Sequence, residues 1–321
     1  MGENDSRMTK KYKIIDWHCD VLLKLQQDQT LQFKDSEDLD VNYEKLKASN
    51  TKVQAMAIFI DPDLNFDDKY QIALEQIEAY KHRVLTTPGV VQLKSFQDIE
   101  NLGEDEIGTF LTLEGLDCVG SDMNKVKHLL DEGVLSIGMT WNDANLACDG
   151  IGEPRGAGLT AFGFNVVEEL NARNLFVDVS HISLKGFDDV LNNAKHVIAS
   201  HSNVKAIASH RRNLDDNQIR RMVEHGFPIH VVYYDAFVTD EEKETQISDL
   251  VRHIEYLRKM GCTNQIGLGS DFDGIATKIK NLEDASKTQN LLKEIEMEFG
   301  ERFTNGIAYD NFINYVNHKM I

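Results

Sequence analysis

His18 and Asp20 end a short apolar segment of the chain, in the sequence D-W-H-C-D. Because side chains alternate between the two faces of a strand, these two side chains would point in the same direction. An imidazole and a carboxylate that converge at the end of a strand are suitable ligands for a metal ion such as Zn²⁺. A capped strand end with a hydrogen-bonded polar pair would show the same pattern, so this motif alone leaves both interpretations open.

Three further apolar segments also end in good metal ligands. Glu114 lies in T-L-E-G, His181 in D-V-S-H and His201 in A-S-H-S-N. A single histidine at such a position is more often a hydrogen-bonded core residue, but ligands at four strand ends together favour a metal centre. Two carboxylates and three imidazoles exceed what one tetrahedral catalytic zinc ion needs. The set therefore favours two metal ions that share a bridging carboxylate.

Two other segments carry groups that could act on a substrate. In G-S-D-F-D-G, Asp271 lies nearer the strand end than Asp273, and a carboxylate beside a metal-bound water could accept its proton. Asp273, which precedes a glycine, is typical of a turn. In S-H-R-R-N, Arg211 and Arg212 could bind a substrate carboxylate through paired hydrogen bonds, although ordinary surface ion pairs would use the same residues.

Eight short apolar segments must position these groups. They run almost continuously apolar, which is typical of strands buried on both faces of a parallel sheet, and helix-like segments lie between them. The predicted strands are Lys13–Asp16, Val53–Ile60, Gly108–Glu114, Val134–Thr140, Leu175–Ser180, His196–Ser200, Phe227–Tyr233 and Gln265–Ser270. The pattern predicts an α/β fold, a single-domain (β/α)8 barrel of the TIM type. A doubly wound sheet has the same periodicity, but no G-x-G-x-x-G or P-loop sequence follows the first strand.

The remaining segments divide into helices, a loop and a tail. The predicted helices are Leu64–Leu85, Asn124–Asp131, Thr160–Arg173, Leu214–Glu224 and Glu242–Met260. Asn290–His318 is expected to form one or two closing helices, and the glycine-rich segment Asp149–Gly158 a long loop after the fourth strand. Residues 1–11 are expected to be a flexible N-terminal tail, and residues 12–321 a single metal-dependent hydrolase domain.

Composition and charge exclude several classes of protein. Of the 321 residues, 41% are hydrophobic and 27% are charged, which is ordinary for a globular protein, and the net charge is −19. So negative a chain would repel phosphate groups, which argues against a nucleic-acid or membrane partner. The start M-G-E-N-D-S-R lacks the apolar centre of a signal peptide, and the four scattered cysteines are expected to be reduced. A cytoplasmic location is predicted.

The motifs together resemble those of the membrane (renal) dipeptidase family of zinc metallopeptidases. Six segments match in order: D-W-H-C-D, T-L-E-G, D-V-S-H, A-S-H-S-N, S-H-R-R-N-L and G-S-D-F-D-G. The resemblance implies a (β/α)8 barrel of the amidohydrolase kind that binds two Zn²⁺ per chain. It places His18 and Asp20 on one zinc ion and His181 and His201 on the other, with Glu114 as the bridge.

The same resemblance implies roles on the substrate side. Asp271 would move the proton, and Arg212 would hold the free C-terminal carboxylate of a dipeptide. The sequence carries Trp141 where animal members have a histidine, and Val232 before Tyr233 where many members have an asparagine before an aromatic residue. Trp141 could donate to a developing oxyanion, form an apolar wall or pack in the core, and we favour the wall. Trp141 and Tyr233 are therefore predicted to contact the substrate.

The predicted function is that of a dinuclear zinc dipeptidase, in which a metal-bridging hydroxide attacks the peptide bond of dipeptides with a free C-terminal carboxylate. Asp20 or Asp271 could meet the free amine. An alternative is another metal-dependent amidohydrolase that acts on a different amide or lactam and does not need Arg212. A non-catalytic metal-binding protein is a third hypothesis, but it would leave Asp271 without a role. The C-terminal helix would belong either to the core or to a homodimer interface.

Overall fold

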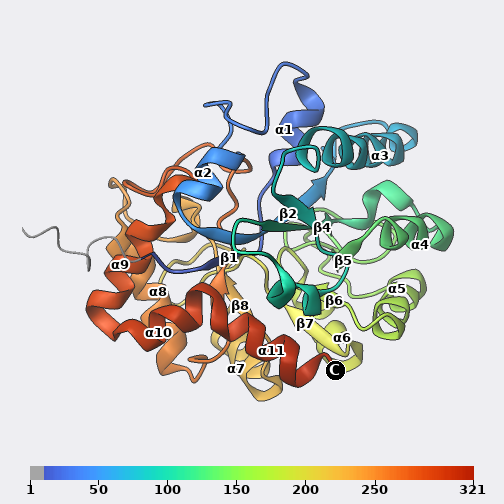
Figure 1. The fold of residues 1–321 in the computed structure, drawn as a ribbon. Helices are drawn as coiled ribbons and strands as arrows, with labels where there is room; N and C mark the ends of the chain where they lie inside the picture. Colours follow the sequence, from blue (N-terminus) through green and yellow to red (C-terminus); the bar gives the residue numbers. More distant parts are fainter. Residues whose placement is uncertain (1–10) are drawn as a thin grey trace, which may run out of the picture.

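Eight short parallel strands in the computed structural model, which describes residues 11–321, surround a common axis, and helices lie outside them (Figure 1). The strands of this ring are β1 (Ile14–Asp16), β2 (Thr51–Phe59), β4 (Ile107–Glu114), β5 (Val134–Gly138), β6 (Phe176–Asp178), β7 (His196–Ile198), β8 (Ile229–Val231) and β9 (Ile266–Leu268). Their order is β7-β6-β5-β4-β2-β1-β9-β8, and a bridge between Ala199 and Ile229 nearly closes the ring. The predicted (β/α)8 barrel is confirmed, and the doubly wound alternative is wrong.

Each of the eight predicted strands is present, and most are shorter than predicted. One further strand, β3 (Val90–Gln92), was not predicted; it pairs in parallel with β4 outside the ring. Its three residues are too few to show a periodic pattern, and its position depends on β4. The predicted tail, residues 1–11, lies outside the described residues except for its last one.

The helices of the described residues cover the outside of the barrel. They are α1 (Val21–Gln27), α2 (Tyr43–Ala48), α3 (Lys69–Ala79), α4 (Met123–Asp131), α5 (Ala161–Ala172), α6 (Leu184–Asn193), α7 (Asp216–His225), α8 (Ile247–Lys259), α9 (Thr288–Phe299), α10 (Glu301–Asn305) and α11 (Asn311–Lys319). The five predicted helices are found, whereas α1, α2 and α6 were not predicted. None of the helices in residues 11–321 is long and apolar enough to cross a membrane.

Local sequence signals set the ends of these helices. At the start of α7, the Asp215 carboxylate accepts the Gln218 N–H at 2.8 Å, and the Gln218 side chain accepts the Asp215 N–H at 2.9 Å. This reciprocal pair satisfies amide groups that have no partner within the helix. At the other end, Gly226 adopts a left-handed φ of 70°, which a residue without a side chain tolerates best.

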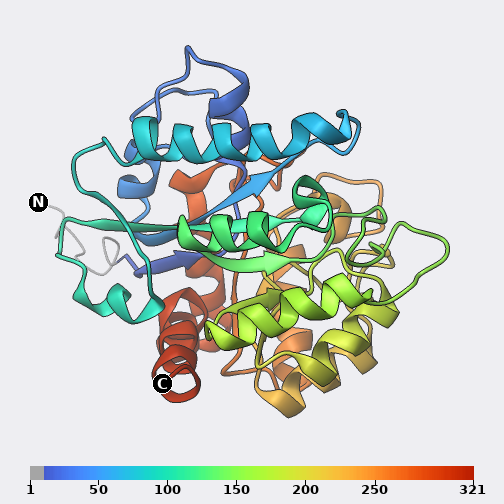
Figure 2. The same ribbon diagram turned by 90° about the vertical axis from the view of Figure 1, so that its right-hand side faces the viewer.

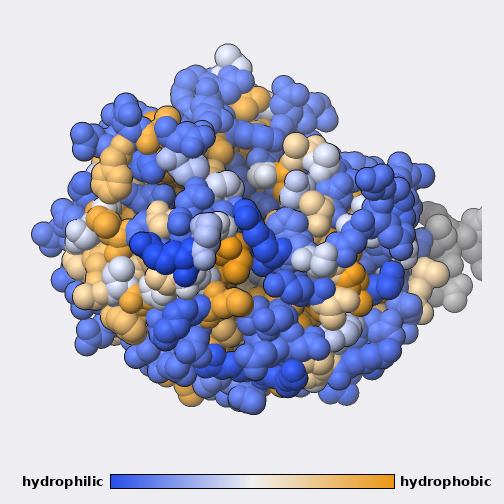
Figure 3. Space-filling model, turned by 180° about the vertical axis from the view of Figure 1, so that it is seen from behind, coloured by the Kyte–Doolittle hydropathy of each residue, from blue (hydrophilic) through white to orange (hydrophobic). Residues whose placement is uncertain are grey.

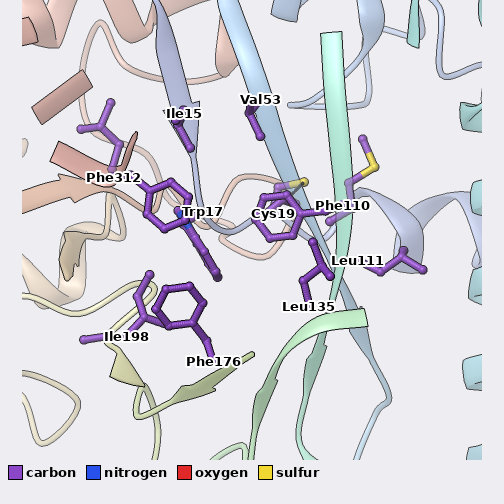
Figure 4. Packing of buried hydrophobic residues seen from close by; sticks show 14 of the residues in the cluster. Ile15, Trp17, Cys19, Val53, Phe110, Leu111, Leu135, Phe176, Ile198 and Phe312 are labelled. Carbon is purple, nitrogen blue, oxygen red and sulfur yellow. Dashed lines mark hydrogen bonds between the residues drawn. The ribbon is translucent and has the colours of Figure 1, made fainter. Parts of the chain in front are cut away.

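Aromatic rings fill the interior of the barrel. The ring centroid of Trp17, just after β1, lies 4.9 Å from that of Phe110 in β4, 5.4 Å from that of Phe176 in β6 and 6.1 Å from that of His230 in β8. These rings come from alternate strands around the barrel, as in the side-chain layers of (β/α)8 proteins. Phe312 of α11 joins them at 5.3 Å from Trp17 (Figure 4).

The helix α11 closes the amino end of the barrel. In Figure 2 the strands run away from α11 and the C-terminus, so their carboxyl ends lie on the opposite face. Tyr315 of α11 is hydrogen-bonded to His196 Nδ1 at 2.8 Å, and Phe312 is buried, so the aromatic residues of this helix belong to the core. Figure 3 shows the face at the carboxyl ends, where hydrophilic residues surround apolar surface near the centre. We call this face the carboxyl rim.

We predict that Phe312→Ala will lower the free energy of unfolding by about 3–5 kcal/mol, because it leaves a cavity beside Trp17. Denaturant-induced unfolding monitored by circular dichroism would measure the change. Met297→Ala is the matched control, since this side chain is 79% exposed on α9 and its loss should change stability by less than about 0.5 kcal/mol. Equal stabilities of the two variants would contradict the role given to α11.

Candidate metal centre

The five predicted metal ligands come together at the carboxyl rim. His18 and Asp20 follow β1, Glu114 ends β4, and His181 and His201 follow β6 and β7. Glu114 Oε2 lies 3.1 Å from His181 Nε2, 3.2 Å from His201 Nε2 and 3.6 Å from His18 Nε2. Asp20 Oδ2 lies 3.3 Å from His18 Nε2. The carboxylate of Glu114 is therefore shared by imidazoles from three different strand ends.

The ligand atoms form two overlapping groups, each small enough to surround one ion. His18, Glu114 and His201 form the first group, and His18, Asp20 and Asp271 form the second. Within each group the ligand atoms lie within 4.8 Å of one another. Asp271, predicted to move a proton, thus lies among the ligands on the Asp20 side. The imidazole rings of His18 and His201 are stacked with centroids 3.8 Å apart.

Hydrogen bonds orient two of the imidazoles for metal binding. His181 Nδ1 lies 2.8 Å from the amide oxygen of Asn142, which can only accept, so Nδ1 carries the proton and Nε2 is free to bind a metal. Similarly, His201 Nδ1 lies 2.8 Å from Ser200 Oγ, and this hydroxyl donates to Asp178. The sequence interpretation missed Asn142 and Asp178, although both lie within a few residues of the predicted site.

The buried carboxylates and imidazoles shift one another's pKa values. Burial raises the pKa of Glu114 to about 7, although the neighbouring His18 opposes this shift. Burial lowers the pKa of His181 and of His201 well below the usual value. For His18 burial acts in the same direction, but the negative charges of Glu114 and Asp20 outweigh it and raise its pKa well above the usual value. A bound cation would let the carboxylates stay ionised in this interior.

The site also contains buried polar atoms that lack a hydrogen-bond partner. His18 Nε2 and Asp20 Oδ1 are two of them, and both residues are buried. Leaving such atoms unpaired inside a protein costs free energy unless something else binds them. Imidazole nitrogens and carboxylate oxygens are the donors that Zn²⁺ prefers in catalytic sites. The residues present therefore fit a metal centre.

Arg212 lies next to the ligands in a buried position. Its guanidinium donates to the His201 carbonyl oxygen at 2.8 Å and to Ser202 Oγ at 3.4 Å, and its Nε has no partner. The residue is 4% exposed, whereas Arg211 is exposed on the surface. Within residues 11–321 no ion pair joins Arg212 to a carboxylate. A buried cation without such a pair is well suited to bind a carboxylate of a ligand.

Asp271 faces the same cluster. Its Oδ1 lies 3.5 Å from His18 Nε2, and its side chain is 14% exposed, so it is open to the site. Burial raises its pKa well above the usual value, although the charge of His18 opposes this, and Asp20 adds to the shift. Burial lowers the pKa of Arg212 to about 10, although the negative charges of Asp271 and Glu114 oppose this.

Trp141 and Tyr233 occupy different environments. The Trp141 ring lies 5.5 Å from that of Phe59 and 6.1 Å from that of His181, and it lines a narrow recess beside the metal ligands. Tyr233 is only 1% exposed and packs edge-on against Phe272 at 5.3 Å, and burial raises the pKa of its hydroxyl well above the usual value. Substrate contact by Tyr233 stays a prediction.

Asp16 anchors the strand ends that carry the ligands. Its carboxylate accepts the Gln54 amide at 2.9 Å, the Ser270 hydroxyl at 2.6 Å and the Ser270 backbone N–H at 2.8 Å. These bonds join β1 to the neighbouring strand β2 and to the segment after β9. Asp16 thereby fixes the positions of His18 and Asp271 relative to each other. The sequence signal that could have identified Asp16 is an acidic residue within a predicted buried strand, two residues before His18.

A parallel (β/α)8 barrel with buried histidines and carboxylates at its carboxyl rim defines the protein as a metal-dependent hydrolase. The family model of the membrane dipeptidases, peptidase family M19, matches residues 3–318. The chain belongs to this family. It is accordingly a metallo-dipeptidase, whose family implies a metal cofactor and dipeptide substrates.

The chain is similar in sequence to known proteins and in fold to solved structures. An uncharacterized dipeptidase of Schizosaccharomyces pombe is 29% identical over 313 residues, which are 89% of this chain and 75% of the yeast protein. An uncharacterized Klebsiella pneumoniae protein is 33% identical over 220 residues, 65% of this chain and 81% of that protein. A Rhodobacter sphaeroides metallo peptidase, solved with a phosphinate mimic of the dipeptide L-Ala-D-Ala, has a TM-score of 0.90 at 19% identity. That comparison covers 97% of this chain and 100% of the solved one, and it shows the shared fold.

We predict that Asn142→Ala will lower metal affinity by about 10- to 100-fold, because His181 loses the acceptor that sets its tautomer. Competition with a chelator on the purified holoenzyme would measure the affinity. Asn171→Ala is the control, since this amide in α5 donates to the carbonyl oxygen of Asn193 at the end of α6, away from the site. If both variants hold the metal as tightly as the wild type, Asn142 does not orient the ligand.

Proposed function

We propose that residues 12–321 act as a dinuclear zinc dipeptidase in the cytoplasm. The observation that carries the proposal is the position of Glu114 Oε2, 3.1–3.6 Å from the Nε2 atoms of three histidines. In the proposal, His18 and Asp20 hold one zinc ion, His181 and His201 hold the other, and Glu114 bridges them. When bound, two zinc ions would polarise the substrate carbonyl and lower the pKa of the attacking water.

Asp271 is proposed to move the proton of the reaction. It would accept a proton from the water that attacks the peptide carbonyl and pass it to the nitrogen of the leaving amine as the C–N bond breaks. Its carboxylate lies beside the ligands His18 and Asp20 and is still partly open to the site, which supports this role.

Arg212 and Trp141 are proposed to determine the orientation in which a dipeptide binds. Arg212 is held by the carbonyl oxygen of His201, whereas Trp141 lies beside His181 and Phe59. The free C-terminal carboxylate of a dipeptide would bind Arg212, and the N-terminal residue would extend toward the Trp141 wall. The peptide bond would then lie over the metal ligands between them. Tyr233, which is 1% exposed and packs against Phe272, is the third residue predicted to contact the substrate.

We predict two zinc ions per chain in the purified enzyme and the loss of both in Glu114→Gln, because a neutral amide cannot offset two neighbouring cations. Elemental analysis of the sample used for a dipeptide-library screen would test metal content and activity together. Glu169→Gln, which alters a carboxylate paired with Arg173 on α5, should keep both ions. Full activity with a single bound ion would contradict the dinuclear proposal.

We predict that Arg212→Ala will reduce kcat/KM for dipeptides with a free C-terminus by at least about 10-fold, because each lost charge-assisted hydrogen bond costs about 1.5–3 kcal/mol. The same dipeptides with an amidated C-terminus should be much less affected. The exposed neighbour Arg211 provides the control variant Arg211→Ala. Equal losses on both kinds of substrate would show that Arg212 serves the structure rather than carboxylate binding.

A further inference from the structure

The turn that carries Asp271 has an unusual backbone. Asp271 and Asp273 both have left-handed φ values, +69° and +68°, which residues with a side chain rarely adopt. Such conformations persist only where the surrounding structure holds them in place. Asp273 has no part in the proposed reaction, but its side chain makes several of the contacts that hold this turn.

A reciprocal set of bonds, which we call the Asp40–Asp273 clasp, fixes the turn. The Asp273 carboxylate is fully buried and accepts the Asp40 N–H at 2.7 Å, the Val41 N–H at 2.9 Å and Lys24 Nζ at 2.8 Å. In return, the Asp40 carboxylate accepts the Asp273 N–H at 2.8 Å and the ammonium group of Lys278. The clasp thus ties the turn to α1 and to the loop before α2.

The turn is also tied directly to the metal ligands. The Asp271 N–H donates to the His18 carbonyl at 3.0 Å, and the Asp20 N–H donates to the Phe272 carbonyl at 2.9 Å. Gly274 completes the turn: a Cβ at this position would lie 2.1 Å from Asp20 Oδ2 and 2.6 Å from Asp271 Oδ1. The two carboxylates therefore occupy the space that a side chain at residue 274 would need.

We propose that Asp273 is a positioning residue that acts through Asp271, an inference that rests on the proposed role of Asp271 in proton transfer. The clasp holds the left-handed turn, and the turn sets where the Asp271 carboxylate stands relative to His18. Without the clasp, the backbone at Asp271 would relax toward a common conformation and its carboxylate would move. A displacement of about 1 Å of a reacting group can reduce turnover by about 100-fold.

The effect should be on kcat rather than on KM. The proposed substrate-binding residues, Arg212 and Trp141, follow other strands and have no bond to the clasp among the described contacts. The predicted ligands Glu114, His181 and His201 follow strands β4, β6 and β7 and have no bond to the clasp among the described contacts. Asp273→Asn should therefore lower kcat by about 10- to 100-fold and leave KM and zinc content within about twofold of the wild type.

Asp249→Asn is the matched control for this variant. Asp249 is also a buried carboxylate that accepts one backbone N–H, from Gln246 at 2.8 Å, and one lysine, Lys243 Nζ at 2.8 Å, but at the start of α8. Its replacement should lower thermal stability and leave kcat unchanged. An unchanged kcat in Asp273→Asn, or a loss of zinc in step with the loss of kcat, would overturn the positioning role.

A double variant gives the sharpest test. If Asp273 acts only through Asp271, then adding Asp273→Asn to Asp271→Asn should cause no further loss of kcat, although each single variant is impaired. A loss in the double variant equal to the product of the single losses would overturn the inference. Residual hydrolysis of the best dipeptide from the library, measured with the zinc-loaded enzymes, provides the readout.

A second, milder substitution at Lys24 tests the same inference if Asp273→Asn does not fold. Lys24 is 34% exposed, and Lys24→Met removes only one of the three donors to Asp273. We expect kcat to fall by about two- to fivefold and Lys24→Arg to restore it; no change in Lys24→Met would overturn the inference. A wild-type protein that hydrolyses no dipeptide would overturn the proposed function, whereas an active wild type with inactive Asp271→Asn and unimpaired Asp273→Asn would overturn the positioning role alone.

Discussion

The ionised state of a buried carboxylate, Glu114, is the constraint on which the carboxyl rim depends. A carboxylate removed from water must be compensated by positive charge and by hydrogen bonds, or it becomes protonated. Around Glu114 the nearest groups are imidazoles from three strand ends, and burial still raises its pKa to about 7. Metal ions would supply the missing positive charge. The same requirement explains why imidazoles from separate strands converge on one oxygen atom.

The two ends of the barrel differ in the kind of side chain that they bury. At the amino end, Trp17, Phe110 and Phe176 pack with Phe312 of α11, and this apolar layer supplies much of the cohesion of the fold. At the carboxyl end, charged and polar groups lie close together away from water, and their burial costs free energy of folding. The burial of unpaired atoms such as Asp20 Oδ1 is tolerated there because the rest of the barrel is well packed. Division of this kind allows one face to carry chemistry while the other maintains the structure.

Three buried or half-buried carboxylates that are not proposed ligands have similar contacts. Asp16, Asp178 and Asp273 each accept several donors, and each lies within three residues of a predicted functional side chain. Asp16 joins neighbouring strand ends, Asp178 holds Ser200 beside His201, and Asp273 anchors the turn of Asp271. Carboxylates at such positions accept hydrogen bonds from backbone and hydroxyl groups, and these bonds hold the segments that carry the predicted functional side chains.

The sequence by itself determined the eight barrel strands and the convergence of the five predicted metal ligands. Continuous apolar runs mark strands buried on both faces, and all parallel strands of a barrel end at the same rim. Tertiary structure alone decided that Arg212 is buried and Arg211 exposed, that Tyr233 is buried against Phe272, and that Asp271 lies beside His18 and Asp20. The difference is physical: strand periodicity is a local property, whereas a left-handed turn such as that at Asp271 is held by bonds like Asp40 to Asp273, between residues 233 positions apart in the chain.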